Sequence, residues 1–468
     1  MEIITQNYES LLKEMIINNF NHLINKNVHR NDSKNKVFNY IDILSNIDDA
    51  MCSIAKKSII TIFNSIDNGF KVSTERKSKY HIKAHHKRSI MTIFGEITFK
   101  RTFYTDKFNK GSFCYLDNYL GLKKHDYFDP YIKALVLDKA ANNSASKVAD
   151  YINNLIGNRV KITDPFNYIS KQTIRNIILE SELSNINPKE LTTPETLYVM
   201  ADEKFISVQN NNKKKIMVKS IVTFDGIKTI NNRKCLKNKN IFATFSKKGP
   251  ANDTLDYLNQ IYNLEKIKNI FVMGDGAGWI KNLAPEFRIT KDTNVIYALD
   301  KFHFKQAVHH LCMHEEIEKI IKHYVRKNMK KDFINVCEAL TQRSPHRKET
   351  IENKRDYIIN NWRYINNLYN YNLTCPMESQ ISHNIADLFT SRPKAYSIKT
   401  LKKLIPLRLL FKNKKNIKDL YLNNYNKKQI LTINEKELNF SMFEQKDINI
   451  KYLNLKTKAN IYNTKIYD

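Results

Sequence analysis

The sequence predicts an α/β fold with a mixed sheet, flanked by helical regions. Three β-type runs come first, at residues 197–209, 214–226 and 241–247, and the helical segment TLDYLNQIYNL follows them. Two short apolar runs, NIFVM and NVIYAL, then alternate with the helical GWIKNLAPEF. This order, β-β-β-α-β-α-β, predicts three leading antiparallel strands and crossover helices in a layered α/β domain.

The length and charge of the chain restrict its class. At 468 residues the chain is too long for one compact core, so we expect two or three domains. Lys and Arg number 77 against 47 Asp and Glu, a net charge of +30 that favours a polyanionic partner such as nucleic acid. The alternative is a codon bias, because Lys, Asn and Ile are all abundant, as in proteins encoded by AT-rich DNA.

Cysteine usage and hydropathy indicate a cytoplasmic protein with no membrane partner, and the expected DNA partner implies that it is nucleoid-associated. The six cysteines form no CxxC pair, which favours reduced thiols over a disulfide framework. The first residues contain no basic-then-apolar leader, and no run of about 18 apolar residues follows. The sequence also lacks the phosphate-binding loop GxxxxGK[ST], which argues against an ATP-driven helper protein.

Residues 1–130 are expected to form a helical region followed by a basic β-hairpin. The strands of this hairpin, 89–94 and 97–104, flank Gly95-Glu96. Arg88 and Arg101 are among the basic residues beside it, and they are candidates for contacts with a phosphate backbone. A solvated edge strand protected by basic residues is the alternative.

Residues 131–190 are predicted to be helical, with a candidate helix-turn-helix. Its last helix begins after Ser170, a good N-cap residue. Four residues early in that helix are candidates for DNA contacts, as in a recognition helix: Lys171, Gln172, Thr173 and Arg175. A helix-turn-helix has a turn of about 3 to 4 residues, whereas residues 157–169 are far longer, so a plain helical bundle is the alternative.

The remaining sequence divides around the predicted sheet. Residues 191–304 hold the strands, 305–374 read as a helical insertion, and 375–405 contain the helix MESQISHNIADLF. Its apolar stripe consists of Met377, Ile381, Ile385 and Leu388. Residues 406–468 form a basic tail rich in Tyr and Asn, which we expect to be solvated or to contact DNA.

Acidic residues on two of these strands predict a metal site. Asp275 follows NIFVM between two glycines, at the carboxyl edge of the sheet. Asp202 lies within an apolar strand, where a carboxylate is costly without a cation or hydrogen-bond donors. Carboxylate oxygens suit Mg²⁺, and Glu378 on a later helix could add a third. Alternatively, each strand-end aspartate forms a turn or caps a helix, as Asp225 and Asp300 could.

Several blocks in the sequence resemble a known family. ADEKFISVQ, GDGAGWIK, LDKFH and MESQISHNIADLFTSRP occur in this order, and TIFGEITFKRTFY and LDNYLGL precede them. They resemble the signature blocks of bacterial insertion-sequence transposases of the ISLre type, a group long catalogued as an uncharacterised protein family and similar to Mutator-like DDE transposases. The resemblance covers roughly residues 85–405.

The resemblance implies a ribonuclease-H-like catalytic core. Asp202, Asp275 and Glu378 would be the catalytic, metal-binding triad, with the helical insertion between the second and third acid. Asp300 and His303 match a supporting Asp-x-x-His element, and Arg392, in the last block, joins the candidate DNA-contacting residues.

The implied function is Mg²⁺-dependent cleavage at the ends of an insertion sequence and strand transfer into target DNA. Mn²⁺ could substitute for Mg²⁺, and the partners would be the terminal repeats, the target DNA and further copies of the chain. Two alternatives remain open. One is a non-catalytic DNA-binding protein derived from a transposase, and the other is a ribonuclease-H-like nuclease that cuts without joining.

Overall fold

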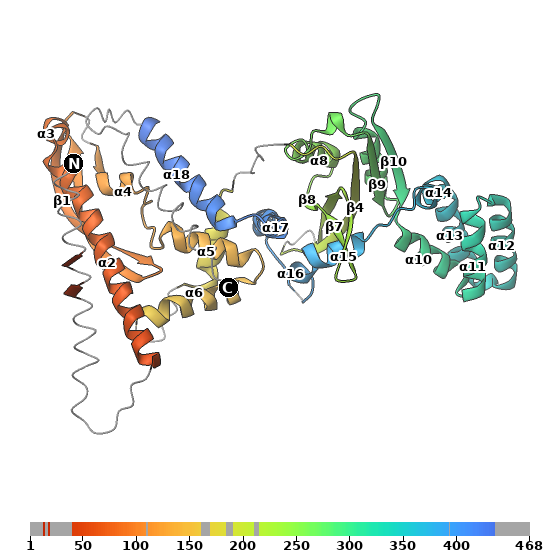
Figure 1. Ribbon diagram of the computed structural model, residues 1–468, viewed down its shortest axis with the longest axis horizontal. Coiled ribbons are helices and arrows are strands. Elements are labelled where there is room, and N and C mark those ends of the chain that lie inside the picture. Colours follow the sequence, from red (N-terminus) through yellow and green to blue (C-terminus); the bar gives the residue numbers. More distant parts are fainter. Residues whose placement is uncertain are drawn as a thin grey trace, which may run out of the picture. The chain divides into compact units, whose positions relative to one another are not determined.

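A computed structural model describes residues 13–14, 17–18, 40–108, 111–160, 169–183, 191–209, 215–392 and 394–435. Figure 1 shows its elements in chain order. The chain divides into two compact units. The smaller unit comprises Ile60–Arg88, Thr98–Asp126 and the residues from Asn423, and the larger unit comprises the rest.

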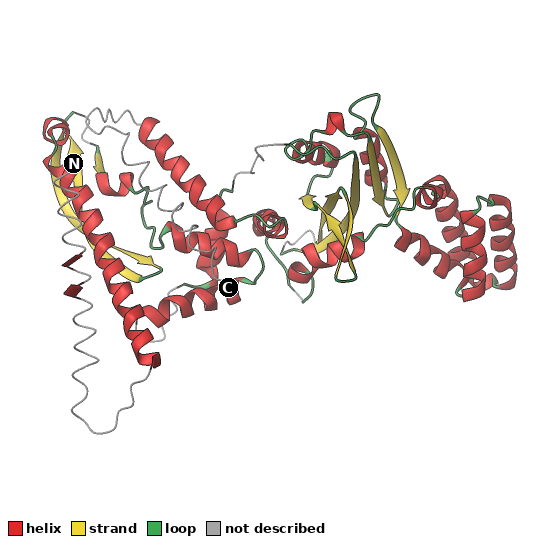
Figure 2. Ribbon diagram, viewed as in Figure 1, coloured by secondary structure: helices red, strands yellow, loops and turns green. Residues whose placement is uncertain are grey.

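A five-stranded mixed sheet forms the centre of the larger unit (Figure 2). Its strands are β4 (Thr196–Ser207), β5 (Lys215–Phe224), β8 (Asn240–Thr244), β9 (Asn269–Gly274) and β10 (Asn294–Leu299). The strand order is β10-β9-β4-β5-β8. β4, β5 and β8 pair antiparallel, whereas β4, β9 and β10 pair parallel. The prediction of a mixed α/β sheet with three leading antiparallel strands is therefore confirmed.

Helices cover both faces of this sheet. Leu197, Val199 and Ala201 of β4 belong to an apolar cluster with residues of α8 (Pro250–Leu258) and α9 (Gly278–Glu286). The alternate residues Met200 and Ile206 belong to a second cluster, with α15 (Met377–Ile381) and α17 (Ile398–Lys412). Because successive strand residues point to opposite faces, one strand contributes to both cores. No helix within the described ranges is long and apolar enough to span a bilayer.

A second hairpin between β5 and β8 was not foreseen from the sequence. It consists of β6 (Gly226–Ile230) and β7 (Arg233–Lys237). Asn231 and Asn232 at its tip have φ values of 48° and 59°. Asparagine tolerates this left-handed conformation, which two-residue hairpin loops require. The burial pattern of β6 and β7 shows mostly exposed residues, so the hairpin leaves little hydrophobic signal in the sequence.

The predicted helical insertion follows β10, an edge strand, and is confirmed. Its helices are α10 (Lys301–Cys312), α11 (Glu315–Arg326), α12 (Lys330–Arg343), α13 (Lys348–Asn360) and α14 (Trp362–Asn370). They share one apolar cluster that includes Phe304, Phe333 and Ile358. α14 also packs against β10, so the insertion is joined directly to the sheet.

The predicted helix after Pro376 contains a π-helical turn. α15 continues into the π turn Ser382–Ala386 and then into α16 (Asp387–Phe389). Arg408 on α17 is fully buried, and it donates hydrogen bonds at 3.0 Å to the carbonyl oxygens of His383 and Asn384. Its Nη2 atom also forms an ion pair with Asp387, with the two carboxylate oxygens at 2.6 and 2.7 Å. Arg408 therefore satisfies polar groups of the π turn.

Part of the expected basic tail is a core helix. Residue 405, where we placed the boundary of the core, lies inside α17, and Leu407 and Leu409 are buried. Helix α18 (Ile417–Glu435) follows it. Residues 436–468 lie outside the described residues.

Three described helices lie between residues 127 and 195 of the larger unit, as predicted. They are α5 (Pro130–Ala140), α6 (Ala145–Val160) and α7 (Lys171–Glu180). They share an apolar cluster with Leu407 and Ile417. The side-chain oxygen of Ser170 accepts a hydrogen bond from the Thr173 amide at 3.1 Å, which confirms the predicted N-cap. Residues 161–168 of the connection between α6 and α7 lie outside the described residues.

The predicted hairpin is longer than expected. It consists of β1 (Tyr80–Thr92) and β2 (Gly95–Asp106), and its turn lies at Ile93-Phe94 rather than at Gly95-Glu96. In the smaller unit, the short strand β3 (Ser112–Cys114) pairs with β2. The unit also contains the end of α2 (Tyr40–Val72), α3 (Thr74–Lys79), α4 (Tyr115–Tyr119) and the part of α18 from Asn423.

The core of the smaller unit is aromatic. Phe70 stacks on Tyr115 with ring centroids 3.9 Å apart, and Tyr104 contacts Phe70 edge-on at 5.1 Å. Aromatic pairs of this kind contribute beyond the apolar area that they bury.

Candidate active site

Three aspartates lie in one row across the parallel strands of the sheet. Met200 on β4 pairs with Met273 on β9, which pairs with Ala298 on β10. All three belong to the same apolar cluster, so their side chains share one face. The residues two positions further along these three segments are Asp202, Asp275 and Asp300. Since side chains alternate with a period of two, the row of apolar residues is followed by a row of carboxylates.

The two glycines beside Asp275 are required by the turn that holds it. A Cβ on Gly274 would lie 2.8 Å from the Ile280 side chain and 3.1 Å from the Ala201 carbonyl oxygen. Gly276 has φ +97°, a conformation that L side chains rarely adopt. The Asp275 carboxylate accepts a hydrogen bond from the Ala277 amide at 2.8 Å. The chain thus turns sharply after β9 and holds this carboxylate at the edge of the sheet.

Asp202 carries an unfavourable negative charge. Burial and, to a smaller extent, the nearby Asp275 carboxylate raise the pKa of its carboxyl group to about 6. The Glu203 amide, which donates to Asp202 at 2.6 Å, and the His303 ring act in the opposite direction. The groups around Asp202 therefore do not fully offset the cost of its negative charge, and a cation would stabilise the ionised form.

This shift predicts that Asp202→Asn stabilises the fold near neutral pH. In the unfolded chain Asp202 ionises near pH 4, and in the folded chain near pH 6. Between these values the folded state binds more protons, so its stability falls as the pH rises, and the penalty is complete above pH 6. We expect the variant to be more stable than the wild type by about 1–3 kcal/mol at pH 7.5. Thermal unfolding across pH measures the difference.

The pH dependence separates this charge effect from a packing effect. At pH 4 and below Asp202 is protonated in the folded chain, so the two proteins should unfold at the same temperature. A stabilisation that persists unchanged at pH 4 would contradict the assignment. Adding Mg²⁺ or Mn²⁺ at pH 7.5 should narrow the gap, because the wild type gains a compensating charge.

Asp300 and His303 form a pair at the end of the row. Asp300 is 2% exposed, and its carboxylate caps α10 by accepting from the Phe302 amide at 3.0 Å. Its second oxygen lies 3.1 Å from Nδ1 of His303. This hydrogen bond raises the pKa of His303, burial lowers it, and the charges of all three aspartates raise it again. His303 therefore interacts electrostatically with all three aspartates.

Glu378 does not join the row directly. It is exposed on the first turn of α15, next to Met377, which packs in the cluster beneath the three aspartates. Within the described ranges, no three His, Cys, Asp or Glu side chains are gathered closely enough to hold one metal ion. Cys375 lies nearer to the aspartates than Glu378 does. Burial raises the pKa of its thiol, and the charges of Asp300 and Asp202 raise it further, which shows that the thiol is close to both. The segment leading into α15 thus lies close to the row.

The residues in the row fit a hard divalent cation. Ser220 on β5 pairs with Asp202, and its buried hydroxyl has no hydrogen-bond partner within the described part of the chain. The donors gathered here are oxygen atoms, which Mg²⁺ and Mn²⁺ prefer. An under-compensated carboxylate, a second carboxylate in register and an unpaired hydroxyl make a coherent set of ligands. Asp202 and Asp275 would hold the ion.

The sequence matches the family described as "Uncharacterised protein family (UPF0236)" over residues 34–424. The chain belongs to this family. The match includes the whole sheet, the helical insertion and α15, so all residues of the candidate site lie within it.

Three relatives carry the family name, all from Caldanaerobacter subterraneus subsp. tengcongensis. One UPF0236 protein is 26% identical over 398 residues, which cover 83% of this chain and 81% of the relative. A second is 27% identical over 400 residues, covering 83% and 82%. A third is 26% identical over 429 residues, covering 90% and 85%. The name of the third combines eleven loci of that genome, and the name of the first combines four.

The helical insertion of this UPF0236 family member supports Asp275, which the sequence did not reveal. The Tyr357 hydroxyl donates to the Asp275 carbonyl oxygen at 2.6 Å. The Asn361 side-chain amide donates to the Tyr357 carbonyl at 2.8 Å, and a Cβ on Gly276 would lie 3.1 Å from Asn361 Oδ1. Tyr357 is separated from Asp275 by 82 residues, so no local pattern marks the contact.

We expect Tyr357→Phe to weaken any activity of the site about tenfold without unfolding the protein. The change removes one hydrogen bond, whose net value is about 1 kcal/mol, and frees the backbone that holds Asp275. The metal concentration for half-maximal cleavage should rise, whereas DNA affinity should stay constant. Tyr364→Phe removes a hydroxyl from the same helical insertion and serves as the control. Equal activity of the two variants would exclude a positioning role for Tyr357.

The candidate DNA-contacting residues differ in exposure. Lys171, Gln172 and Arg175 are exposed on the first turns of α7, whereas the Thr173 hydroxyl lies 3.0 Å from Ser170 within the helix cap. Arg392 is exposed beyond α16.

In the smaller unit, the two arginines predicted at the hairpin are engaged internally. Arg88 is 8% exposed, pairs with Asp117 at 3.0 Å and donates to the carbonyls of Lys123 and Asp126. Arg101 also pairs with Asp117. Their contacts favour a structural role for these two side chains.

Proposed function

We propose that the chain is a Mg²⁺-dependent DDE transposase that cleaves the ends of an insertion sequence and transfers the strand into target DNA. The row of carboxylates across β4, β9 and β10 carries this proposal. Asp202 on β4 and Asp275, directly after the neighbouring strand β9, interact electrostatically, and one cation could compensate both. A row used only for turns would not need a buried, under-compensated carboxylate in the middle of a strand.

The topology of the sheet supports the ribonuclease-H-like core that the sequence resemblance implies. Three antiparallel strands come first, and two parallel strands follow, with acidic residues at their carboxyl ends. Asp202 lies on the first strand and Asp275 directly after the fourth. Glu378 would then come from a helix packed on the same face, as the third acid of the proposed triad.

The family comparison supports a mobile element. One relative has a single name for eleven loci in one genome, and another for four. A gene that moves and copies itself leaves such multiple loci, whereas an ordinary nuclease or regulator has no reason to do so. The family membership of this chain extends the same expectation to it.

The residues of the site suit phosphoryl transfer. When bound, divalent ions would activate the attacking water or 3′-hydroxyl and stabilise the leaving oxygen. Asp202, Asp275 and Glu378 would hold these ions, and Tyr357 would fix the backbone of Asp275. His303, with its raised pKa, would carry positive charge beside the phosphate. No side chain need attack the phosphodiester, so no covalent enzyme intermediate is expected.

The net charge of +30 would position the DNA through phosphate contacts that weaken with salt. The exposed residues of α7 belong to a helical region that precedes the sheet in the same unit. We propose that this region binds the element ends while the carboxylate row performs the chemistry.

A cleavage and joining assay tests this function. Purified protein is incubated with labelled duplexes that carry the terminal sequences flanking its gene, with Mg²⁺, Mn²⁺ or EDTA and with a second, unlabelled DNA. We expect metal-dependent nicks at the element ends and joining of the freed 3′ ends to the second DNA. Cleavage without joining would instead indicate a nuclease. Binding without cleavage under all metal conditions would indicate a non-catalytic regulator.

A further inference from the structure

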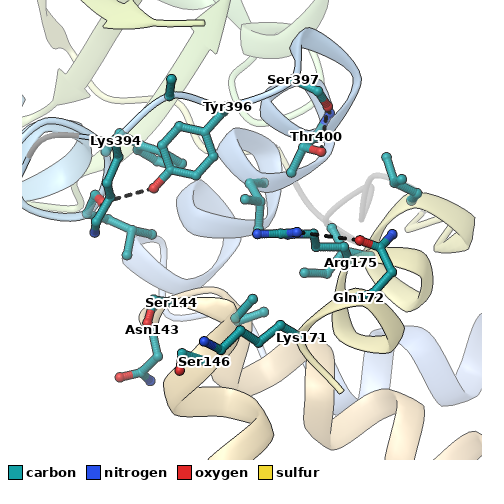
Figure 3. Close-up of a pocket in the computed structure, with 18 of the residues that line it drawn as sticks. Asn143, Ser144, Ser146, Lys171, Gln172, Arg175, Lys394, Tyr396, Ser397 and Thr400 are labelled. Carbon is teal, nitrogen blue, oxygen red and sulfur yellow. Dashed lines mark hydrogen bonds between the residues drawn. The ribbon is translucent and has the colours of Figure 1, made fainter. Parts of the chain in front are cut away.

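A pocket of about 560 Å³ lies between the helical region and the end of the sheet domain, within the larger unit. Figure 3 shows its lining side chains, which come from two walls. One wall carries Lys171, Gln172 and Arg175 of α7, and the other carries Lys394 and Tyr396 from the segment before α17.

The charge of the pocket is one-sided. Its lining contains three cations, Lys171, Arg175 and Lys394, and no carboxylate. None of the three forms an ion pair with a carboxylate within the described part of the chain. Other cations of the chain do pair with acids, as Arg408 does with Asp387. The pocket therefore has an uncompensated positive charge that suits an anion.

The backbone adds to this preference. The first residues of three helices line the pocket: Ala145 of α6, Lys171 of α7, and Thr400 in the first turn of α17. Helix N-termini carry partial positive charge, although the Thr400 amide itself is capped by the Ser397 side chain at 3.1 Å. The hydroxyls of Ser144, Ser146 and Ser397 lie in the same lining, as Figure 3 shows. Hydroxyls, amides and cations together are the donors that contact phosphate in DNA complexes.

The pocket is connected to the strand that carries Asp202. Tyr396 forms a parallel bridge with Val208, its amide donates to the Ser207 carbonyl at 3.2 Å, and the Gln209 amide donates to the Tyr396 carbonyl at 2.9 Å. Gln209 also lines the pocket. From Asp202 to Ser207 the strand extends about 17 Å, at about 3.3 Å per residue. This length corresponds to about five base pairs of DNA, at about 3.4 Å each.

We propose that this pocket binds the sugar-phosphate backbone of DNA and fixes its position relative to the carboxylate row. The claim that the pocket positions DNA for cleavage rests on the proposed function. The claim that the pocket binds phosphate groups does not require the protein to cleave DNA. α7 and the end of β4 would grip the same DNA strand, so that binding by the helical region places the scissile phosphate near Asp202 and Asp275. Figure 3 shows the side chains that line both walls of the pocket.

Binding of a fluorescent 20-base-pair duplex by the full-length chain tests this inference, with EDTA present so that cleavage cannot occur. The variants are Lys171→Gln with Arg175→Gln, and Lys394→Gln alone. We expect the first to lose at least about tenfold in affinity at 0.1 M salt, and the salt slope of log K to fall by about 1 to 2 units. Lys394→Gln should lose several-fold.

The control is Lys268→Gln with Lys319→Gln, two exposed lysines outside the pocket with the same total change of charge. It should change the affinity less than about twofold, since only direct phosphate contacts enter the salt slope. Equal effects of the pocket variants and the control would overturn the inference, and so would wild-type affinity of Lys394→Gln. Titration with inorganic phosphate provides a third measurement. If the pocket variants lose phosphate binding but keep the DNA affinity of the wild type, the pocket is a site for a small anion instead.

These results are independent of the proposed function. Asp275→Asn should bind the duplex as tightly as the wild type, because its carboxylate does not line the pocket. If the pocket variants bind normally while the wild type cleaves, the inference fails and the proposed function stands. If they lose binding and the wild type never cleaves, the pocket is a DNA site and the proposed function fails.

Discussion

Asp275→Asn should reduce DNA strand cleavage by at least about a hundredfold, while the protein stays folded and still binds DNA. The substitution keeps the shape of the side chain and its ability to accept from the Ala277 amide. It removes the charge that, with Asp202, would hold the metal ion. Groups that stabilise charge in a transition state are typically worth 10²–10³ in rate. Single-turnover cleavage of a terminal duplex in Mg²⁺ measures the loss.

Asp225→Asn is the matched control for this experiment. Asp225 also follows a strand, β5, and its carboxylate accepts from the Asn238 side chain at 2.6 Å. Because β5 runs antiparallel to β4, Asp225 lies at the opposite edge of the sheet. Its variant should cleave like the wild type. Unchanged cleavage by Asp275→Asn, or equal losses in the two variants, would remove the carboxylate row from the mechanism.

Arg408→Met should destabilise the larger unit by about 3 kcal/mol or more, since the carbonyl oxygens of His383 and Asn384 would lose their donor, at a cost of about 1–3 kcal/mol for each buried acceptor. The Arg408 guanidinium contacts the carbonyls of His383 and Asn384, the Asp387 carboxylate, and the Asn142 side chain of the helical region. A methionine would fill the volume and satisfy none of these groups. Thermal unfolding of Arg408→Met measures the effect. If this variant is insoluble, pulse proteolysis of the milder variant Arg408→Lys replaces it.

Lys412→Met provides the comparison. Lys412 is on the same helix, and its ammonium group lies 4.0 Å from Asp387 with partial exposure. Partly exposed pairs of this kind contribute about 0–1 kcal/mol, so this variant should unfold within a few degrees of the wild type. If Arg408→Met were as stable as Lys412→Met, the π turn would not depend on Arg408.

The sequence predicted the sheet because its order and its apolar runs are local signals. NIFVM and NVIYAL became the adjacent parallel strands β9 and β10, and the two glycines around Asp275 mark a turn that no other residue would permit. Ser170 was found as a helix cap for the same reason, since its partner lies three residues away. Patterns over a few residues therefore sufficed for these elements and for the position of Asp275 at the end of a strand.

The rest depends on contacts between distant parts of the chain. The sequence placed Asp300 only in a supporting role, whereas strand register puts it in line with Asp202 and Asp275. No local sequence pattern marks Tyr357 or Arg408. The partner of Tyr357 lies 82 residues away, and the partners of Arg408 lie between 21 and 267 residues away. The prediction of a basic tail from residue 406 was wrong for the end of α17. The lysines between its buried leucines made this core helix look like part of a charged, solvated segment.

Direct binding of Mn²⁺ tests the central claim, that the carboxylate row is a metal centre. Electron paramagnetic resonance of free Mn²⁺, titrated with the full-length chain and a terminal duplex, counts bound ions for the wild type, Asp275→Asn and Asp225→Asn. We predict bound Mn²⁺ in the wild type and in Asp225→Asn, and a loss of at least one ion or about tenfold in affinity in Asp275→Asn. Equal binding by all three proteins would contradict the claim and leave Asp275 as a turn residue.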